Sequence, residues 1–331
     1  MAKPKKPPKP SGTATRPDSM VRLEDSSSEV AKKVLSVHFR KMEANEKGTK
    51  KGEDIEKLHD MRVAVRRMRT AATIFGRFLD PGEFGPFVRE LRTLGRCLGP
   101  VRDMDVILDH ARSFYEKMPT RERLDFENLL ILWQEKRAKL RDRLLEYLES
   151  SAYRRFKRDF AQFLADASAG VLPVVTKKGR VRPSLLSHEG PVVLFERLVA
   201  VRAYEGWLDC EDVPLRRYHR LRIDVKRIRY TLEFLSDVIG PEAVPLIEAF
   251  KAAQDHLGEM REAWMTADLI EQDFLPLGVD GPKAGAHPGI AAYLTARRTR
   301  SKELRKSFPE IWTTVNNREV HRRIAAIAAS F

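Results

Sequence analysis

The chain has 331 residues and a formal net charge of +14, because 61 lysines and arginines outnumber 47 aspartates and glutamates. Hydrophobic residues make up 42% of it, which excludes a fully disordered chain and allows one large or two small folded domains. The positive charge indicates an anionic partner, and nucleic acid, an acidic membrane and polyphosphate all remain open on this basis.

Cysteine usage and hydropathy both indicate a cytoplasmic protein. The two cysteines, Cys97 and Cys210, have no second cysteine nearby at metal-binding spacing, which is typical of a reducing compartment. No apolar run approaches the length that spans a bilayer, and the N-terminus lacks the apolar core of a signal peptide. We therefore expect no membrane association.

The N-terminal segment differs in composition from the rest of the chain. Residues 1–27 begin with a run of lysine, proline and small residues that cannot bury apolar surface. We predict a disordered tail over 1–27 and a folded part over 28–331.

The folded part shows helical periodicity nearly throughout, and strand patterns are scarce. Asp80-Pro81-Gly82 and Leu98-Gly99-Pro100 are expected to end helices, and residues 168–190 have the composition of a linker. The predicted fold is all-α, with a first helical bundle at 28–167 and a second at 191–331. Helices are expected from about 28, at 54–79, 83–100, from 102, at 120–150, 152–167, and from 192.

One basic motif occurs in both halves of the chain, beginning at His59 and again at His219. A Leu-Gly stretch follows each copy, leading to Arg102 in the first half and Arg261 in the second. Such self-similarity indicates a tandem duplication. The paired basic positions are His59 with His219, Arg62 with Arg222, Arg66 with Lys226, Arg69 with Arg229, and, upstream of the Leu-Gly stretches, Arg92 with Lys251.

Helix geometry gives each copy of the motif two faces. At about 100° per residue, one side of the first motif carries His59, Arg62, Arg66 and Arg69, and one side of the second carries His219, Arg222, Lys226 and Arg229. Each set is a cationic strip, and apolar residues such as Val65 and Val225 lie on the opposite side. A solvated face usually mixes signs to form pairs along the helix, whereas these strips lack carboxylates apart from Glu233. Arginine dominates the strips, and its planar fork matches phosphate oxygens. The strips therefore predict a phosphate-rich anion as ligand.

The motif residues resemble those of the CHAD family, the conserved histidine α-helical domain. The resemblance rests on the motif at His59, the Leu-Gly-x-x-Arg-Asp stretch that begins at Leu98, and the Lys226-Arg-x-Arg-Tyr230 form. It implies two helical bundles related by a pseudo-twofold axis around a basic central cleft or pore. It also implies binding of inorganic polyphosphate there and association with polyphosphate granules. By motif position, the implied binding residues are His59, Arg62, Arg66, Arg69, His219, Arg222, Lys226 and Arg229, with Arg102, Arg92 and Lys251 as weaker candidates.

Three other functions compete with polyphosphate binding. A metal site is disfavoured because each strip has one histidine, ringed by arginines. Catalysis is disfavoured because no phosphate-binding loop or nucleophile motif is present, so we expect no enzyme activity and no cofactor. Nucleic-acid binding stays open, although the strips contain no aromatic residue to stack on bases. A role as the accessory domain of a phosphate-processing enzyme also stays open.

Overall fold

The computed structural model describes residues 20–208, 213–274 and 287–331, so Cys210 and residues 1–19 of the expected tail lie outside the described residues. These ranges are all-α, as predicted, and their only β-bridges are isolated pairs. The α-helices are α1 (Ser27–Lys51), α2 (Ile55–Phe75), α3 (Pro81–Glu116), α4 (Arg123–Glu149), α5 (Ser151–Ala165), α6 (Leu186–Arg202), α7 (Glu205–Leu208), α8 (Leu215–Phe234), α9 (Ser236–Ile239), α10 (Ala243–Phe274), α11 (Pro288–Val315) and α12 (Arg318–Ala329). Short 3-10 turns lie at Gly76–Phe78, Thr120–Glu122 and Gly240–Glu242.

Residues 20–27, which the sequence assigns to the tail, pack against the helices. The Val21 side chain is buried, and its backbone N–H donates to Asp237 Oδ2 at 2.9 Å. Ser26 caps α1 by accepting from the Glu29 N–H at 3.2 Å, and the Glu29 carboxylate accepts from the Ser26 N–H in return. This capping box fixes where the first helix begins.

Helix α3 is continuous, and the break expected at Leu98-Gly99-Pro100 is wrong. The helix runs from Pro81 to Glu116 with Pro100 inside it. Its buried face continues across the proline, with Leu94, Leu98, Val101 and Met104 at helical spacing. Pro100 is exposed, so its ring points to solvent, and the packing of the buried face offsets the missing hydrogen bond.

The segment between α5 and α6 is irregular, in line with the composition of the predicted linker. It spans residues 166–185, and α6 begins at Leu186, earlier than the sequence suggests. The segment is attached to the start of α1 because the Ser27 N–H donates to the Ser184 carbonyl at 2.7 Å.

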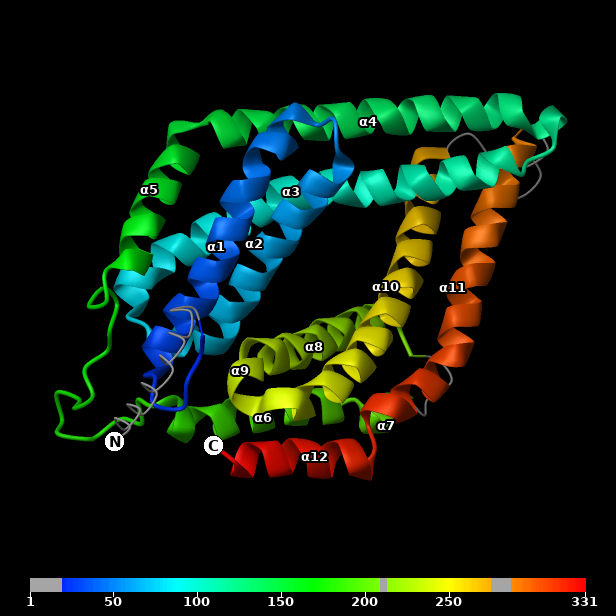
Figure 1. Ribbon diagram of the computed structural model, residues 1–331. Helices are drawn as coiled ribbons and strands as arrows, with labels where there is room; N and C mark the ends of the chain where they lie inside the picture. The colour runs from blue at the N-terminus through cyan, green and yellow to red at the C-terminus, as the bar shows by residue number, and fades with distance from the viewer. Residues whose placement is uncertain (1–19, 209–212, 275–286) are drawn as a thin grey trace, which may run out of the picture.

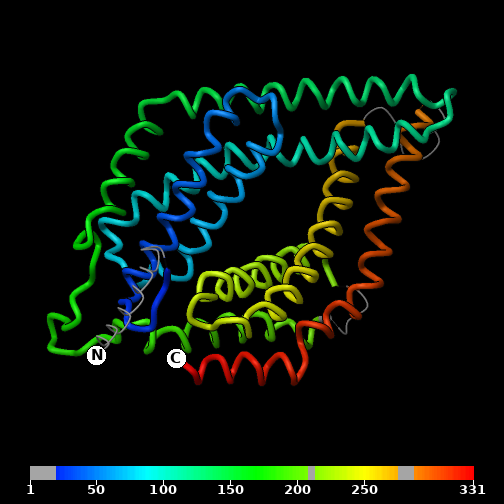
Figure 2. The backbone as a smooth tube through the Cα atoms, viewed as in Figure 1, coloured from blue at the N-terminus to red at the C-terminus, as the bar shows by residue number. Residues whose placement is uncertain are grey.

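The helices form a closed frame that is joined at two places (Figure 1). At one, α1 and α2 pack near α6 and α8 in the larger hydrophobic core. At the other, the far ends of the α3–α4 and α10–α11 hairpins meet (Figure 2). Their side chains form a smaller core that includes Trp133 and Tyr293. Trp133 Nε1 donates to Asp273 Oδ2 at 3.0 Å across this second junction. A twofold relation between the halves stays a prediction.

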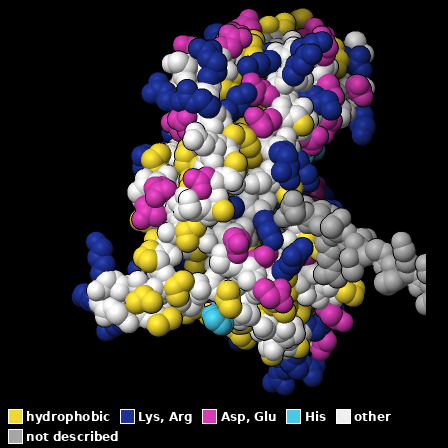
Figure 3. Space-filling view, turned by 60° about the vertical axis from the view of Figure 1, so that its left-hand side comes forward, with side chains coloured by type: hydrophobic (Ala, Val, Ile, Leu, Met, Phe, Trp, Pro, Cys, Tyr) yellow, Lys and Arg dark blue, Asp and Glu magenta, His cyan; other side chains and the backbone are white. Residues whose placement is uncertain are grey.

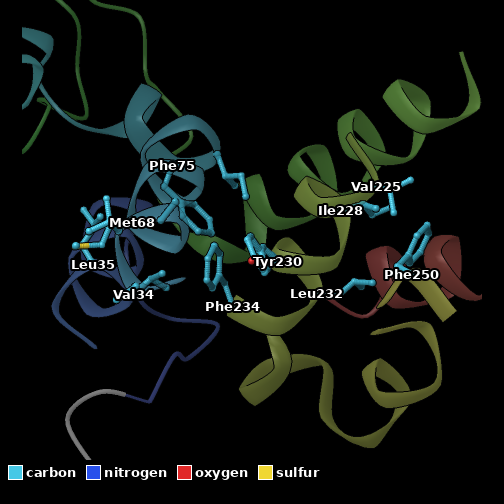
Figure 4. Packing of buried hydrophobic residues seen from close by; sticks show 14 of the residues in the cluster. Val34, Leu35, Met68, Phe75, Val225, Ile228, Tyr230, Leu232, Phe234 and Phe250 are labelled. Carbon is cyan, nitrogen blue, oxygen red and sulfur yellow. The ribbon is translucent and has the colours of Figure 1, made fainter. Parts of the chain in front are cut away.

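The two motif helices, α2 and α8, contact each other directly in the larger core (Figure 4). Phe75 of α2 lies against Phe234 of α8, with ring centroids 6.3 Å apart. Met68 and Tyr230 are fully buried on the same two helices. Because the apolar faces of α2 and α8 are held in the core, their polar faces have fixed directions.

Candidate anion-binding site

A cavity of about 570 Å³ lies where α2, α3, α8 and α10 come together. Basic side chains from all four helices line it, so both copies of the motif contribute to one space. Its basic lining residues are Arg62, Arg66 and Arg69 of α2, Arg92 of α3, His219, Arg222, Lys226 and Arg227 of α8, and Arg261 of α10.

The register of α2 follows from its cap and its buried face. Asp54 begins the helix by accepting from the Glu56 N–H at 2.8 Å. Met61, Ala64 and Met68 are buried at helical spacing. Residues on the neighbouring stripe, including Arg62 and Arg66, are thereby turned toward the cavity.

Helix α8 is placed in the same manner, by a core stripe of Leu221, Val225 and Ile228, each fully buried. Arg222 and Lys226 are one helical turn apart on the adjacent stripe and both line the cavity. Residues of both strips therefore face one cavity.

Gly95 on α3 allows Arg69 to approach the helix closely. A Cβ atom at Gly95 would lie 2.5 Å from Arg69 Nη1, closer than non-bonded atoms can come. A larger residue would push the guanidinium away. The glycine therefore makes room for one of the cations of the cavity.

Several cations at the cavity have no anionic partner among the residues that the structure describes. The side chains of Arg69, Arg222, Lys226 and His219 make no ion pair or hydrogen bond there, and Arg222 Nε is buried without an acceptor. Arg69 is exposed, whereas Arg222, Lys226 and His219 are half-buried, and burying cations without counter-charges is costly. An anion entering the cavity would lower this cost.

Burial first, and repulsion between neighbouring cations second, lower the pKa values of these groups. Burial, followed by the charges of Arg66 and Arg222, lowers the pKa of Lys226 to about 7. Burial and the Arg261 charge lower the pKa of Arg222 to about 10 and also lower the pKa of His219. The pKa of His59 is lowered by burial and by Arg102. Each shift disfavours the charged form of its group, and three of the four groups, Lys226, Arg222 and His219, line the cavity.

One carboxylate, Asp103 of α3, lies at the edge of this group of cations. Its Oδ1 accepts from Arg62 Nη2 at 3.0 Å, and its Oδ2 lies 3.7 Å from Arg261 Nη2. Asp103 thus links a cation of the first half to one of the second. Its carboxylate thereby balances part of the positive charge of both guanidinium groups.

Behind the cavity, Tyr230 and Glu233 organise the remaining arginines of the two motifs. Glu233 pairs with Arg67 at 2.8 Å and with Arg229 at 2.9 Å. The two guanidinium groups lie 4.9 and 4.5 Å from the centre of the Tyr230 ring. This buried network joins α2 to α8.

The structure brings most, though not all, of the sequence-predicted residues to the cavity. Arg229 points into the network at Glu233 and is 7% exposed, and Lys251 lies on the outer surface with Asp255 as its partner. The reason is that α8 and α10 direct these two side chains to other faces. His59 and Arg102 are not lining residues either. The predicted residues that do line the cavity are Arg62, Arg66, Arg69, Arg92, His219, Arg222 and Lys226.

Sequence reasoning overlooked or discounted four residues of the site. By helical angle Arg227 lies off the strip, and Glu262 follows Arg261 where Asp103 follows Arg102, so neither residue is among the predicted binding residues, yet both line the cavity. The repeat itself contained the signal for Arg261, since it matches Arg102 of the first Leu-Gly stretch. Nothing local indicated the roles of Tyr230 and Asp103, because their partners are distant in sequence.

The outer surface differs from the cavity in its charge pattern. On the face seen in Figure 3, lysine and arginine side chains alternate with aspartate and glutamate over much of the surface. Within the described ranges, no group of histidine, cysteine and acidic residues is arranged to hold a metal ion. None of the helices described there is both long and apolar enough to cross a membrane.

Comparisons with known proteins agree with this architecture. The chain is similar in fold to the CHAD domain from the plant Ricinus communis, with a TM-score of 0.69 and 21% identity over 90% of this chain and 95% of that one. It is also similar to PptA from Streptomyces chartreusis, with a TM-score of 0.61 and 16% identity over 87% of this chain and 99% of that one. No curated protein sequence matches it. The CHAD domain family model matches residues 33–271, and the chain therefore belongs to the CHAD domain family.

Proposed function

We propose that this protein binds inorganic polyphosphate in the cavity between α2, α3, α8 and α10, without catalysing its turnover. One observation carries the proposal: cations from both motif copies converge on a single cavity, and Arg69, Arg222 and Lys226 have no carboxylate partner among the described residues. A chain of linked phosphates supplies the missing negative charge at regular spacing.

The alternative anion is single-stranded nucleic acid, which shares a phosphate backbone. Proteins that bind it usually stack aromatic side chains on the bases. The described residues that line the cavity include no phenylalanine, tyrosine or tryptophan, and His219 is the one ring among them. An anion without bases therefore suits the cavity better. Recruitment of the protein to polyphosphate granules would follow from such binding, and we include it in the proposal.

Calorimetric titration tests the proposal. Polyphosphates of defined length are compared with single-stranded DNA of equal charge, in the same buffer. We expect tighter binding of polyphosphate, with a log–log salt slope of about −4 to −6 for six to eight neutralised charges, if single-stranded nucleic acid is a fair guide. Equal or tighter binding of the DNA would favour the nucleic-acid function. A flat salt response would exclude both polyanions.

A further inference from the structure

Lys226 differs in its surroundings from the lysines that form ion pairs in the described part of the chain. It is half-buried in the lining of the cavity, and no acceptor or carboxylate among the described residues contacts its amine. By contrast, Lys33, Lys136 and Lys157 each pair with a carboxylate. A lysine held among arginines without a counter-charge is a candidate nucleophile, because only the neutral amine attacks a carbonyl carbon.

The charges around Lys226 come from every helix that borders the cavity. Cations outnumber carboxylates there, and the nearby carboxylates each pair with a cation other than Lys226. Asp224 binds Arg227 at 2.9 Å, and Asp103 binds Arg62. Because of burial and these charges, the pKa of Lys226 falls to about 7. The facing cations are Arg62, Arg66 and Arg69 of α2, Arg92 of α3, His219, Arg222 and Arg227 of α8, and Arg261 of α10.

The same arrangement would position a small reagent that carries a phosphate group. Arg222 lies one turn from Lys226 on α8, and Arg66 faces both from α2. A phosphate held by these guanidinium groups lies beside the amine. An acyl group attached to that phosphate would then be within reach of Lys226.

We propose that Lys226 is a modification site that acyl phosphates acylate directly, and that acylation weakens the binding of polyphosphate. The inference rests on the proposed function, because the phosphate of the reagent uses the same cations. In the reaction the neutral amine attacks the carbonyl carbon and a C–N bond forms. The C–O bond to the phosphoryl group breaks, inorganic phosphate leaves with the electron pair, and the amine proton passes to solvent. The resulting amide has no charge, so the cavity loses one cation.

Acetylation by acetyl phosphate at pH 7.5 tests the site. The full-length protein is incubated with the reagent, and acetylation at each lysine is followed by mass spectrometry. An ordinary lysine is neutral in about one molecule in a thousand at this pH. We expect Lys226 to react at least about tenfold faster than Lys251, an exposed lysine on α10 that serves as the internal control. Polyphosphate should protect Lys226 and leave Lys251 unaffected.

A phosphate-free donor and one variant complete the experiment. With p-nitrophenyl acetate, the preference for Lys226 should persist but shrink, because that reagent has no phosphate to bind. Treatment with acetyl phosphate should weaken polyphosphate binding about tenfold in the wild type. The same treatment should not change the polyphosphate affinity of the Lys226→Arg variant, because that variant keeps the cation and lacks the reactive amine.

The outcomes separate this inference from the proposed function. If the untreated protein binds polyphosphate but Lys226 reacts no faster than Lys251 with either donor, the inference is overturned and the proposed function stands. If Lys226 reacts selectively with both donors but the untreated protein does not bind polyphosphate, the proposed function fails and the reactive lysine stands. If acetyl phosphate weakened polyphosphate binding as much in Lys226→Arg as in the wild type, another lysine would be responsible, and this result would also overturn the inference.

Discussion

Arg66 of α2 and Tyr230 of α8 are joined by a hydrogen bond across the two motif helices: Arg66 Nε donates to the Tyr230 hydroxyl at 3.1 Å. Tyr230 is fully buried, and the guanidinium groups of Arg67 and Arg229 lie against its ring. The tyrosine is therefore fixed in place, and it fixes in turn an arginine that lines the cavity. A residue of the second motif thus positions a residue of the first.

Removing this hydroxyl should weaken polyphosphate binding without unfolding the protein. Tyr230→Phe keeps the ring in the core but releases Arg66, and we expect a loss of about 1 kcal/mol in binding free energy, or roughly fivefold in affinity. Calorimetry measures the affinity and thermal unfolding checks the fold. Tyr147→Phe is the matched control, because it removes a tyrosine hydroxyl that donates to Glu90 in the first half, outside the cavity lining. An equal loss of affinity in both variants would contradict a positioning role for Tyr230.

Neutralising Asp103 should strengthen polyphosphate binding. Asp103→Asn frees Arg62 and Arg261 from a competing carboxylate, and we expect an affinity gain of about three- to tenfold at low salt. Asp255→Asn makes the same change in net charge on the outer surface, where Asp255 pairs with Lys251, and it should have little effect. Weaker binding by Asp103→Asn would show that Asp103 orients the arginines for the ligand instead of competing with it.

Polyphosphate affinity should fall as the pH rises above 7. In the free protein the pKa of Lys226 is about 7, and a bound polyanion raises that pKa because it favours the charged amine. At pH values between the pKa of Lys226 in the free protein and its pKa in the complex, binding is therefore accompanied by the uptake of a proton. In that range the affinity should drop by up to about tenfold per pH unit. Lys226→Arg should flatten the profile between pH 7 and 9, since arginine stays protonated. A decline of the same steepness in this variant would exclude Lys226 as its cause.

The histidines should add a second rise in affinity as the pH falls toward 6. The pKa values of both His59 and His219 are lowered in the free protein, and a bound polyanion opposes that shift. The double variant His59→Gln and His219→Gln should lose this rise while keeping the dependence due to Lys226. Polyphosphate affinity is measured at pH 6 and pH 7 for the wild type and the double variant. If the affinity changed between the two pH values by the same factor in both proteins, the histidines would not be the cause.

The two motif copies should act as one site on a long polyphosphate. Arg62→Ala with Arg66→Ala removes two charged contacts on α2, each worth about 1.5–3 kcal/mol, so affinity should fall at least about a hundredfold although α8 is intact. The pair Arg222→Ala and Lys226→Ala should behave alike. Arg158→Ala with Arg322→Ala removes two charges from exposed positions and controls for net charge. If each double variant instead kept half of the binding sites at wild-type affinity, the two motif copies would bind independently.

The sequence by itself determined the helical fold and the identity of the two cationic strips. Both depend on local periodicity. Val65 and Val225 lie on the buried sides of their helices, and the angle of 100° per residue then sets the directions of Arg62 and Arg222 around the same helices. The helix through Pro100 was missed because the proline is tolerated only where packing on the other side of α3 continues.

Only the tertiary structure decided which cations share a cavity and which are neutralised. Arg229 belongs to the motif, but it pairs with Glu233, whereas Arg261 reaches the cavity from a different helix. Helical periodicity fixes the direction of a side chain relative to its own helix and carries no information about the helix that faces it. The partners of Arg66 and Arg62, Tyr230 and Asp103, therefore emerged only when α2 was packed against α8 and α3, because electrostatic and hydrogen-bonding interactions depend on distances in space and not on separation along the chain.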